Sequence, residues 1–133
     1  MNPGNVRNPT ILLADDMADT RMMLARFFEG RGYDVVEAES GREAVEAAVR
    51  DSPDLIVMDI YMPNLDGLTA ARHIRGNEST RDVPIVIFSA YGELGFDNDL
   101  RRQTLAIGRT EYLKKPVDLD QLLEVIERLL KSE

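Results

Sequence analysis

The sequence contains no cysteine, and it has one histidine, His73, in 133 residues. The missing cysteines exclude disulfides, thiol catalysis and cysteine-based zinc sites, and they fit the cytoplasm, where disulfides are rare. A single histidine argues against a metal centre built from several imidazoles. A chain of this length forms one domain that buries roughly two thirds of its unfolded surface, so it needs no such cross-link.

Long apolar runs are also missing. No run approaches the length that spans a membrane, and residues 1–9 lack the apolar core of a signal peptide. Those nine residues are polar and contain proline and glycine. We therefore expect a disordered N-terminal tail over residues 1–9, one domain over residues 10–131, and a cytoplasmic location.

Positive charge is in deficit. Sixteen Lys and Arg residues stand against twenty-four Asp and Glu residues, which gives a formal net charge of -8. This balance disfavours non-specific binding to nucleic acid or to anionic membranes. A protein or a small cationic partner is the better expectation.

What the sequence does contain is a regular alternation of short apolar runs with helical patterns, which is typical of an α/β fold with a parallel sheet. The expected strands are Thr10–Ala14, Tyr33–Ala38, Asp54–Met58, Pro84–Phe88 and Glu111–Leu113. Helices are expected over Asp19–Glu29, from the capping box at Ser40 to Val49, over Leu68–Arg75, and after Asp118. Between the last two strands, glycines predict a long loop over residues 91–99, with a helix beginning near Asp97 or Asn98.

Polar side chains follow four of the expected strands. Asp15 and Asp16 follow the first, Asp59 the third, Ser89 the fourth and Lys115 the fifth. Because the carboxyl ends of parallel strands lie at one edge of the sheet, we expect these residues to converge. Three converging carboxylates repel one another, and an all-oxygen set favours Mg²⁺, or Mn²⁺, rather than zinc. The alternative is that each acid only caps a turn or a helix.

Lys115 and Ser89 would add a cation and a hydroxyl donor to such a metal site. Phosphoryl transfer needs little more, because its transition state spreads negative charge over oxygens that a metal, a lysine and a hydroxyl can stabilise. Asp59 could then be the nucleophile. Taken alone, a serine in a turn and a solvated lysine before Pro116 remain open alternatives.

Five motifs in this order resemble the receiver domain of bacterial two-component response regulators, over about residues 10 to 131. They are Leu12–Asp16, Met58–Pro63, Asp66–Gly67, Ser89–Ala90 and Tyr112–Pro116. The resemblance implies a flavodoxin-like, doubly wound (βα)5 domain with a five-stranded parallel sheet in the order 2-1-3-4-5.

The resemblance also implies roles at the metal and phosphorylation site. Asp59 would accept a phosphoryl group from a phosphohistidine on a histidine kinase or a phosphotransfer protein. Asp16 would bind Mg²⁺ directly, Asp15 through water, and the backbone carbonyl of Tyr61 would join Asp59 in completing the protein ligands. The protein would catalyse only its own phosphorylation and dephosphorylation.

For the switch, the resemblance implies that Ser89 moves to bind the phosphoryl group, that Lys115 pairs with it, and that Tyr112 turns inward afterwards. The surface around Tyr112 would then be read by a downstream protein, with no direct contact to nucleic acid or membrane. His73 is expected to be an ordinary surface histidine. The chain ends soon after its last helix, so we expect either a single-domain regulator acting through protein contacts or a piece of a longer protein.

Three other classes of protein share part of this pattern. Haloacid dehalogenase-like phosphatases also use an aspartate nucleophile with magnesium, but they need a second aspartate where Tyr61 stands. A flavodoxin-like nucleotide or flavin binder would find its phosphate repelled by Asp15 and Asp16. A receiver-shaped interaction module that never takes phosphate is disfavoured by the intact set Asp16, Asp59, Ser89 and Lys115.

Overall fold

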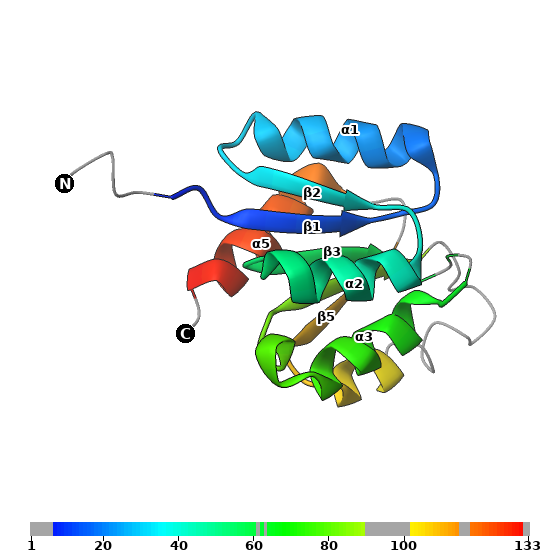
Figure 1. Ribbon diagram of the computed structural model, residues 1–133. Helices are drawn as coiled ribbons and strands as arrows, with labels where there is room; N and C mark the ends of the chain where they lie inside the picture. The colour runs from blue at the N-terminus through cyan, green and yellow to red at the C-terminus, as the bar shows by residue number, and fades with distance from the viewer. Residues whose placement is uncertain (1–6, 61, 63, 90–101, 115–117, 132–133) are drawn as a thin grey trace.

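A computed structural model describes residues 7–60, 62, 64–89, 102–114 and 118–131. In this part of the chain, five parallel strands form one sheet in the order β2-β1-β3-β4-β5 (Figure 1). The strands are β1 (Thr10–Ala14), β2 (Asp34–Ala38), β3 (Leu55–Asp59), β4 (Ile85–Ser89) and β5 (Thr110–Lys114). The predicted fold class and the predicted strand order are therefore confirmed.

Helices connect these strands and cover the sheet. They are α1 (Ala18–Glu29), α2 (Gly41–Asp51), α3 (Gly67–Gly76) and α5 (Leu119–Lys131), with a short 3-10 helix, η2 (Glu78–Thr80), after α3. A helical segment also spans residues 102–106. The predicted loop over residues 91–99 and the predicted helix start at Asp97 or Asn98 lie outside the described residues.

The predicted strand boundaries agree with the structure to within one residue. The difference between predicted and observed boundaries that matters most for the site is at β3. The apolar pattern predicts that this strand ends at Met58, but in the structure it continues through Asp59. Backbone pairing explains the extra residue, because Asp59 lies opposite Phe88 of β4. A ladder is built from main-chain groups and can therefore include a polar side chain that hydrophobicity alone would exclude.

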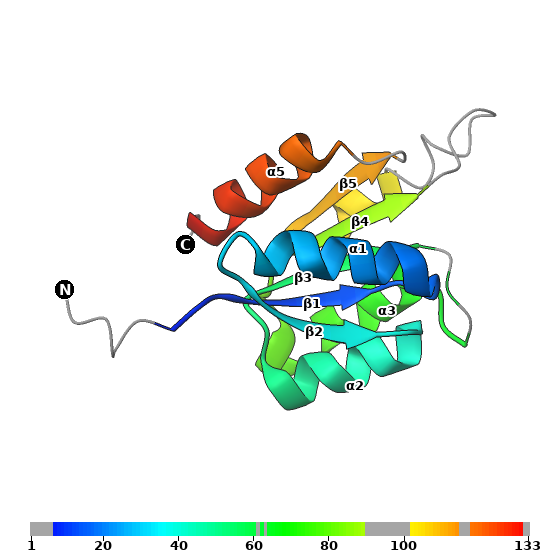
Figure 2. The same ribbon diagram turned by 90° about the horizontal axis from the view of Figure 1, so that it is seen from above.

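The sheet is buried on both faces, as the continuous apolar runs predict. Alternate residues of each strand point to opposite sides, so β3 contributes Ile56 and Met58 to one core and Leu55 and Val57 to the other. The first core lies under α2 and α3, and the second lies under α1 and α5. Figures 1 and 2 show these two helical layers on opposite faces of the sheet.

Side-chain caps begin three of the helices, and those at Ser40 and Asp118 are where the sequence pattern predicts them. The Ser40 hydroxyl accepts a hydrogen bond from the Glu43 backbone N–H at 3.1 Å, and Glu43 accepts from the Glu39 N–H at 3.0 Å. Asp66 accepts from the Thr69 N–H at 2.8 Å, and Asp118 accepts from the Asp120 N–H at 2.9 Å. These bonds satisfy donors that would otherwise lack a partner in the first helical turn.

The last residues of the predicted tail, residues 7–9, are described by the structure and contact the domain. Arg7 donates to both carboxylate oxygens of Asp54 at 3.2 Å, and the Pro9 carbonyl accepts from the Asp34 N–H at 3.0 Å. Residues 1–6 lie outside the described residues, so disorder there stays a prediction. Within the described residues, no helix combines the length and apolar composition that crossing a membrane requires.

Gly41 opens α2 at a point where the chain passes very close to the loop after β3. A Cβ atom added to Gly41 would lie 1.7 Å from the Leu65 carbonyl oxygen and 2.6 Å from its carbon. These are backbone atoms, so no side-chain rotation can relieve the clash. A glycine at this position lets α2 pack against the segment that links β3 to α3.

We expect Gly41→Ala to lower the free energy of unfolding by about 3 kcal/mol, because the backbone of one segment must move to admit the methyl group. Gly76→Ala is the matched control. A Cβ atom at Gly76, at the end of α3, meets nothing within 4 Å. The control should leave stability unchanged or raise it by up to about 1 kcal/mol. Denaturant unfolding followed by circular dichroism measures both, and equal effects would contradict the packing argument.

Candidate functional site

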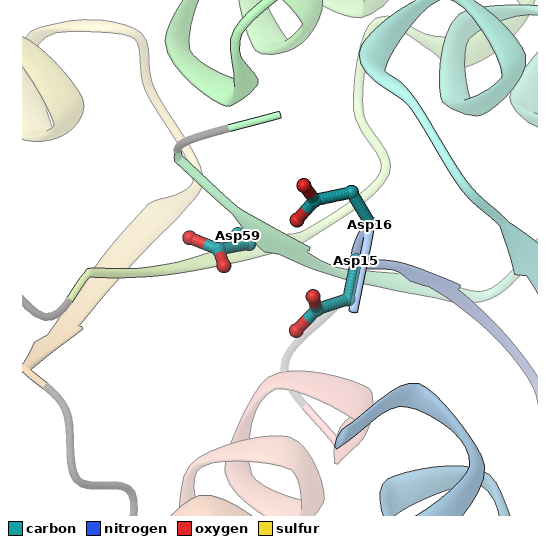
Figure 3. Close-up of side chains that lie close together, drawn as sticks. All are labelled: Asp15, Asp16 and Asp59. Carbon is teal, nitrogen blue, oxygen red and sulfur yellow. The ribbon is translucent and has the colours of Figure 1, made fainter. Parts of the chain in front are cut away.

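Three carboxylates gather at the carboxyl edge of the sheet. Asp15, Asp16 and Asp59 each place one oxygen so that all three atoms lie within 4.8 Å of one another. Figure 3 shows these three side chains close together, beside the ends of two neighbouring strands. The pairing of Ala14 with Met58 explains this, because the residues that follow them in the chain then lie side by side. The predicted convergence of these acids is confirmed.

Asp15 is fully buried and is held by hydrogen bonds to three different segments. Its backbone N–H donates to the Ala38 carbonyl at the end of β2, at 3.1 Å. Its carboxylate Oδ1 accepts from the Met17 N–H at 2.9 Å, and its carbonyl accepts from the Arg21 guanidinium at 2.8 Å. Asp16 by contrast is exposed, so the cluster meets solvent on the Asp16 side.

Electrostatic repulsion within this cluster is large enough to need compensation. Asp15 and Asp59 are almost completely buried, with exposed fractions of 0% and 5%. At a separation of 4.8 Å and an effective dielectric constant of about 20, two such charges repel by about 3 kcal/mol. A divalent cation converts that repulsion into attraction, and three carboxylates without nitrogen or sulfur donors suit Mg²⁺ or Mn²⁺.

Gly67 fixes the backbone around Asp59 from the other side. Its N–H donates to the Ile60 carbonyl at 2.8 Å, and an added Cβ would lie 2.3 Å from the Asp59 carbonyl oxygen. The Asp66 cap sets the start of α3 at the same place. The sequence motif contains both residues, but this close approach of two backbones is visible only in the structure.

Ser89 is the last residue of β4, the strand next to β3. It follows Phe88, which is paired with Asp59, and it is itself paired with Lys114 of β5. The predicted placement of Ser89 at a strand end beside Asp59 is therefore confirmed for the backbone. Lys115 and Tyr61 lie outside the described residues, so their predicted roles stay predictions.

Tyr112 lies in β5, paired with Ile87, and is 8% exposed. Its side chain is therefore buried in this structure, while the neighbouring Lys114 is exposed. His73 is exposed in the last turn of α3, as predicted for an ordinary surface histidine.

Arg21 is a residue that sequence reasoning missed. It lies in the first turns of α1, where an arginine normally indicates only a solvated helix face, yet its side chain is 11% exposed. Its contact with the Asp15 carbonyl connects it to the acidic cluster. No spacing rule applied to the sequence selects it, because its partners come from the ends of two strands.

Comparison with known proteins agrees with this architecture. The sequence profile of the response regulator receiver domain matches residues 11–127. Over 121 residues the chain is 37% identical to chemotaxis protein CheY of Bacillus subtilis, covering 90% of this chain and 96% of CheY. Over 118 residues it is 40% identical to the transcriptional regulatory protein PdtaR of Mycobacterium tuberculosis, covering 88% of this chain and 54% of PdtaR.

A solved structure is similar over its whole length. The receiver domain of a sensor histidine kinase from Pseudomonas aeruginosa superimposes with a TM-score of 0.83 at 32% identity, covering 95% of this chain and 100% of that one. That structure has a magnesium ion coordinated in its active site cleft.

Several relatives are longer proteins. The chain spans about half the length of PdtaR and of the phosphate regulon regulatory protein PhoB of Pseudomonas aeruginosa, 54% and 52% respectively. The match therefore concerns the receiver part that they share. With the profile match over residues 11–127 and the sheet order and acidic cluster described above, this chain belongs to the response regulator receiver domain family.

Proposed function

We propose that Asp59 of this receiver accepts a phosphoryl group from a phosphohistidine on a histidine kinase or a phosphotransfer protein. One observation carries the proposal: the Asp59 carboxylate lies within 4.8 Å of those of Asp15 and Asp16 at the carboxyl edge of the sheet. Receiver domains are signalling modules that accept phosphate rather than conventional enzymes. The chemistry that we assign to this chain is limited to its own phosphorylation and dephosphorylation.

In the proposed reaction a carboxylate oxygen of Asp59 attacks phosphorus. The new O–P bond forms as the P–N bond to the donor imidazole breaks, and the electron pair of that bond returns to the imidazole nitrogen. Because the transition state spreads negative charge over the three phosphoryl oxygens, positive charge and hydrogen-bond donors accelerate the step. We assign these roles to Lys115 and to the Ser89 hydroxyl.

The metal would be held by the acids of the same cluster. We assign direct binding to Asp16, Asp59 and the Tyr61 carbonyl, and binding through water to Asp15. The donor set fits Mg²⁺, with Mn²⁺ as the substitute, because all its atoms are oxygens. When bound, the cation supplies positive charge that neutralises the carboxylates and the phosphoryl oxygens.

Transmission of the signal would start from the new charge on Asp59. A phosphoryl group adds negative charge and acceptor oxygens, so movement of the Ser89 hydroxyl toward it is favourable. Tyr112 lies two strands away from Asp59 and is buried here. We assign it the role of coupling Ser89 movement to the surface that a downstream protein reads.

The chain covers about half the length of longer relatives such as PdtaR and PhoB, so the function that we propose concerns the receiver part alone. The cytoplasm is the compartment typical of the family, and we propose it for this receiver. A haloacid dehalogenase-like phosphatase is disfavoured by the profile match over residues 11–127. A receiver that never takes phosphate remains as an outcome of the test below.

Incubation with acetyl phosphate and Mg²⁺ should give a single phosphoryl adduct by intact mass. Asp59→Asn should abolish the adduct, because the amide is not a nucleophile for this reaction, and chelation of Mg²⁺ by EDTA should abolish it as well. Asp120→Asn, an exposed acid in the first turn of α5, is the control and should be phosphorylated normally. An adduct that persists in Asp59→Asn would refute the assignment, and no adduct on the parent protein would favour the interaction-module alternative.

Asp16→Asn should weaken Mg²⁺ binding by at least about tenfold, because it removes a charged oxygen ligand. Isothermal titration calorimetry with MgCl₂ measures this directly. Asp19→Asn is the matched control, since it removes one exposed acid from the first turn of α1 without touching the cluster. Equal losses in the two variants would show that overall charge, rather than ligation, governs binding.

A further inference from the structure

We infer that Arg21 is a positioning residue that orients the peptide between Asp15 and Asp16 and thereby sets the affinity of the acidic cluster for a divalent cation. The inference rests on the metal site proposed above and assigns that site a determinant outside the three acids. Arg21 would touch neither the cation nor the phosphoryl group. Its action would be through the Asp15 carbonyl oxygen alone.

The Arg21 guanidinium contacts three oxygen atoms from different residues. Its Nη1 donates to the Asp15 carbonyl at 2.8 Å, and its Nε donates to Glu37 Oε1 at 2.8 Å. Its Nη2 lies 3.9 Å from Glu39 Oε2. The Arg21 side chain is 11% exposed, whereas those of Glu37 and Glu39 are 42% and 70% exposed. The bond to the Asp15 carbonyl is therefore the one that lies on the shielded side of the guanidinium, and it is charge-assisted.

These contacts of Arg21 connect three segments of the fold. Arg21 belongs to α1, Glu37 lies in β2, Glu39 follows β2, and the accepting carbonyl lies just beyond β1. The guanidinium group is planar and rigid. The bond from Nε to Glu37 and the contact of Nη2 with Glu39 therefore define the direction in which Nη1 points toward the Asp15 carbonyl. The Asp15 carbonyl is therefore held in a direction set by the end of β2, not only by its own strand.

This matters most for Asp16, because the same peptide carries both residues. Asp15 is fixed by bonds from its N–H and its Oδ1 as well as by Arg21. Asp16 is exposed, and the described residues show no hydrogen bond to its side chain. The direction of the Asp16 side chain thus depends on the preceding peptide plane. Without Arg21 that plane can rotate, and the carboxylate must be reoriented when a cation binds.

Charge and geometry predict opposite effects, which makes the inference testable. As a cation near the acids, Arg21 should by Coulomb interaction alone weaken Mg²⁺ binding, so removing it should strengthen binding. If Arg21 acts by positioning, removing it should weaken binding. Outer-shell partners of metal ligands affect affinity by about 10- to 100-fold, which can exceed a charge effect already offset by Glu37 and Glu39.

The decisive variant is Arg21→Gln/Glu37→Gln, which keeps the net charge at the parent value while removing the bond to the Asp15 carbonyl. We expect its Mg²⁺ dissociation constant to rise about tenfold in calorimetric titration, and its Mn²⁺ dissociation constant to rise similarly by electron paramagnetic resonance. Arg128→Gln/Glu111→Gln is the matched control. It removes another helix-to-strand ion pair, with a 3.4 Å contact, and should leave metal affinity unchanged.

Arg21→Lys provides the conservative comparison. One ammonium group replaces the forked guanidinium and cannot hold the Asp15 carbonyl and Glu37 in the same geometry, so we expect a loss of about threefold, between the parent and the double variant. Thermal unfolding of each variant separates this effect from global destabilisation. If the double variant does not fold, the lysine variant decides the question.

Unchanged or tighter Mg²⁺ binding in the charge-neutral double variant would overturn the inference, as would parent affinity in Arg21→Lys where the double variant is unfolded. Failure of the proposed function has a different signature. In that case the parent protein would give no phosphoryl adduct with acetyl phosphate, whereas the Mg²⁺ affinities of the parent and the Arg21 variants are compared without any phosphodonor.

Discussion

The structure depends on one constraint, the parallel register that places the end of β1 beside the end of β3. Ala14 pairs with Met58, so the next residues of both strands emerge side by side at one edge of the sheet. Main-chain hydrogen bonds on both sides and apolar packing on both faces hold this register. A shift by one residue would exchange the two faces of a strand and separate the acids, so the same packing that stabilises the sheet also builds the site.

Concentrating negative charge at this edge opposes folding, and the surrounding structure shows how the cost is met. Asp15 is buried but accepts hydrogen bonds through its Oδ1 and its carbonyl. The Arg21 guanidinium, itself paired with Glu37 and Glu39, donates to the Asp15 carbonyl, and the open side at Asp16 gives a cation access from solvent. The site is therefore buried and hydrogen-bonded where it faces the core and accessible where it faces water, which suits reversible metal binding.

Two glycines let helices begin against described residues at the end of β3 and before α3. Gly67 lets α3 begin against the Asp59 backbone, and Gly41 lets α2 begin against the Leu65 carbonyl. Both sites lie between the strand that carries Asp59 and the helices of one face. A side chain at Gly41 would clash with the Leu65 backbone and one at Gly67 with the Asp59 backbone, which links the packing of α2 and α3 to the geometry around Asp59.

The class of the fold, the strands and the main acids can be predicted from the amino-acid sequence alone. Continuous apolar runs separated by capped helical patterns specify a parallel sheet, and a polar residue at the end of such a run can be identified without coordinates. The strand end at Asp59 was missed by one residue because pairing with Phe88, a main-chain interaction, extends β3. The resemblance to receivers rests on local motifs, which can be recognised without any tertiary contact.

The surroundings of those motifs depend on how the helices and strands pack against one another. The contacts of Arg21 with Asp15 and Glu37 join α1, the residue that follows β1, and β2, and Gly67 brings the start of α3 close to the Asp59 backbone. Neither leaves a periodic or compositional signal in the chain. The physical reason is that hydrophobic periodicity records which face of an element is buried, whereas these contacts depend on where separate elements end relative to one another.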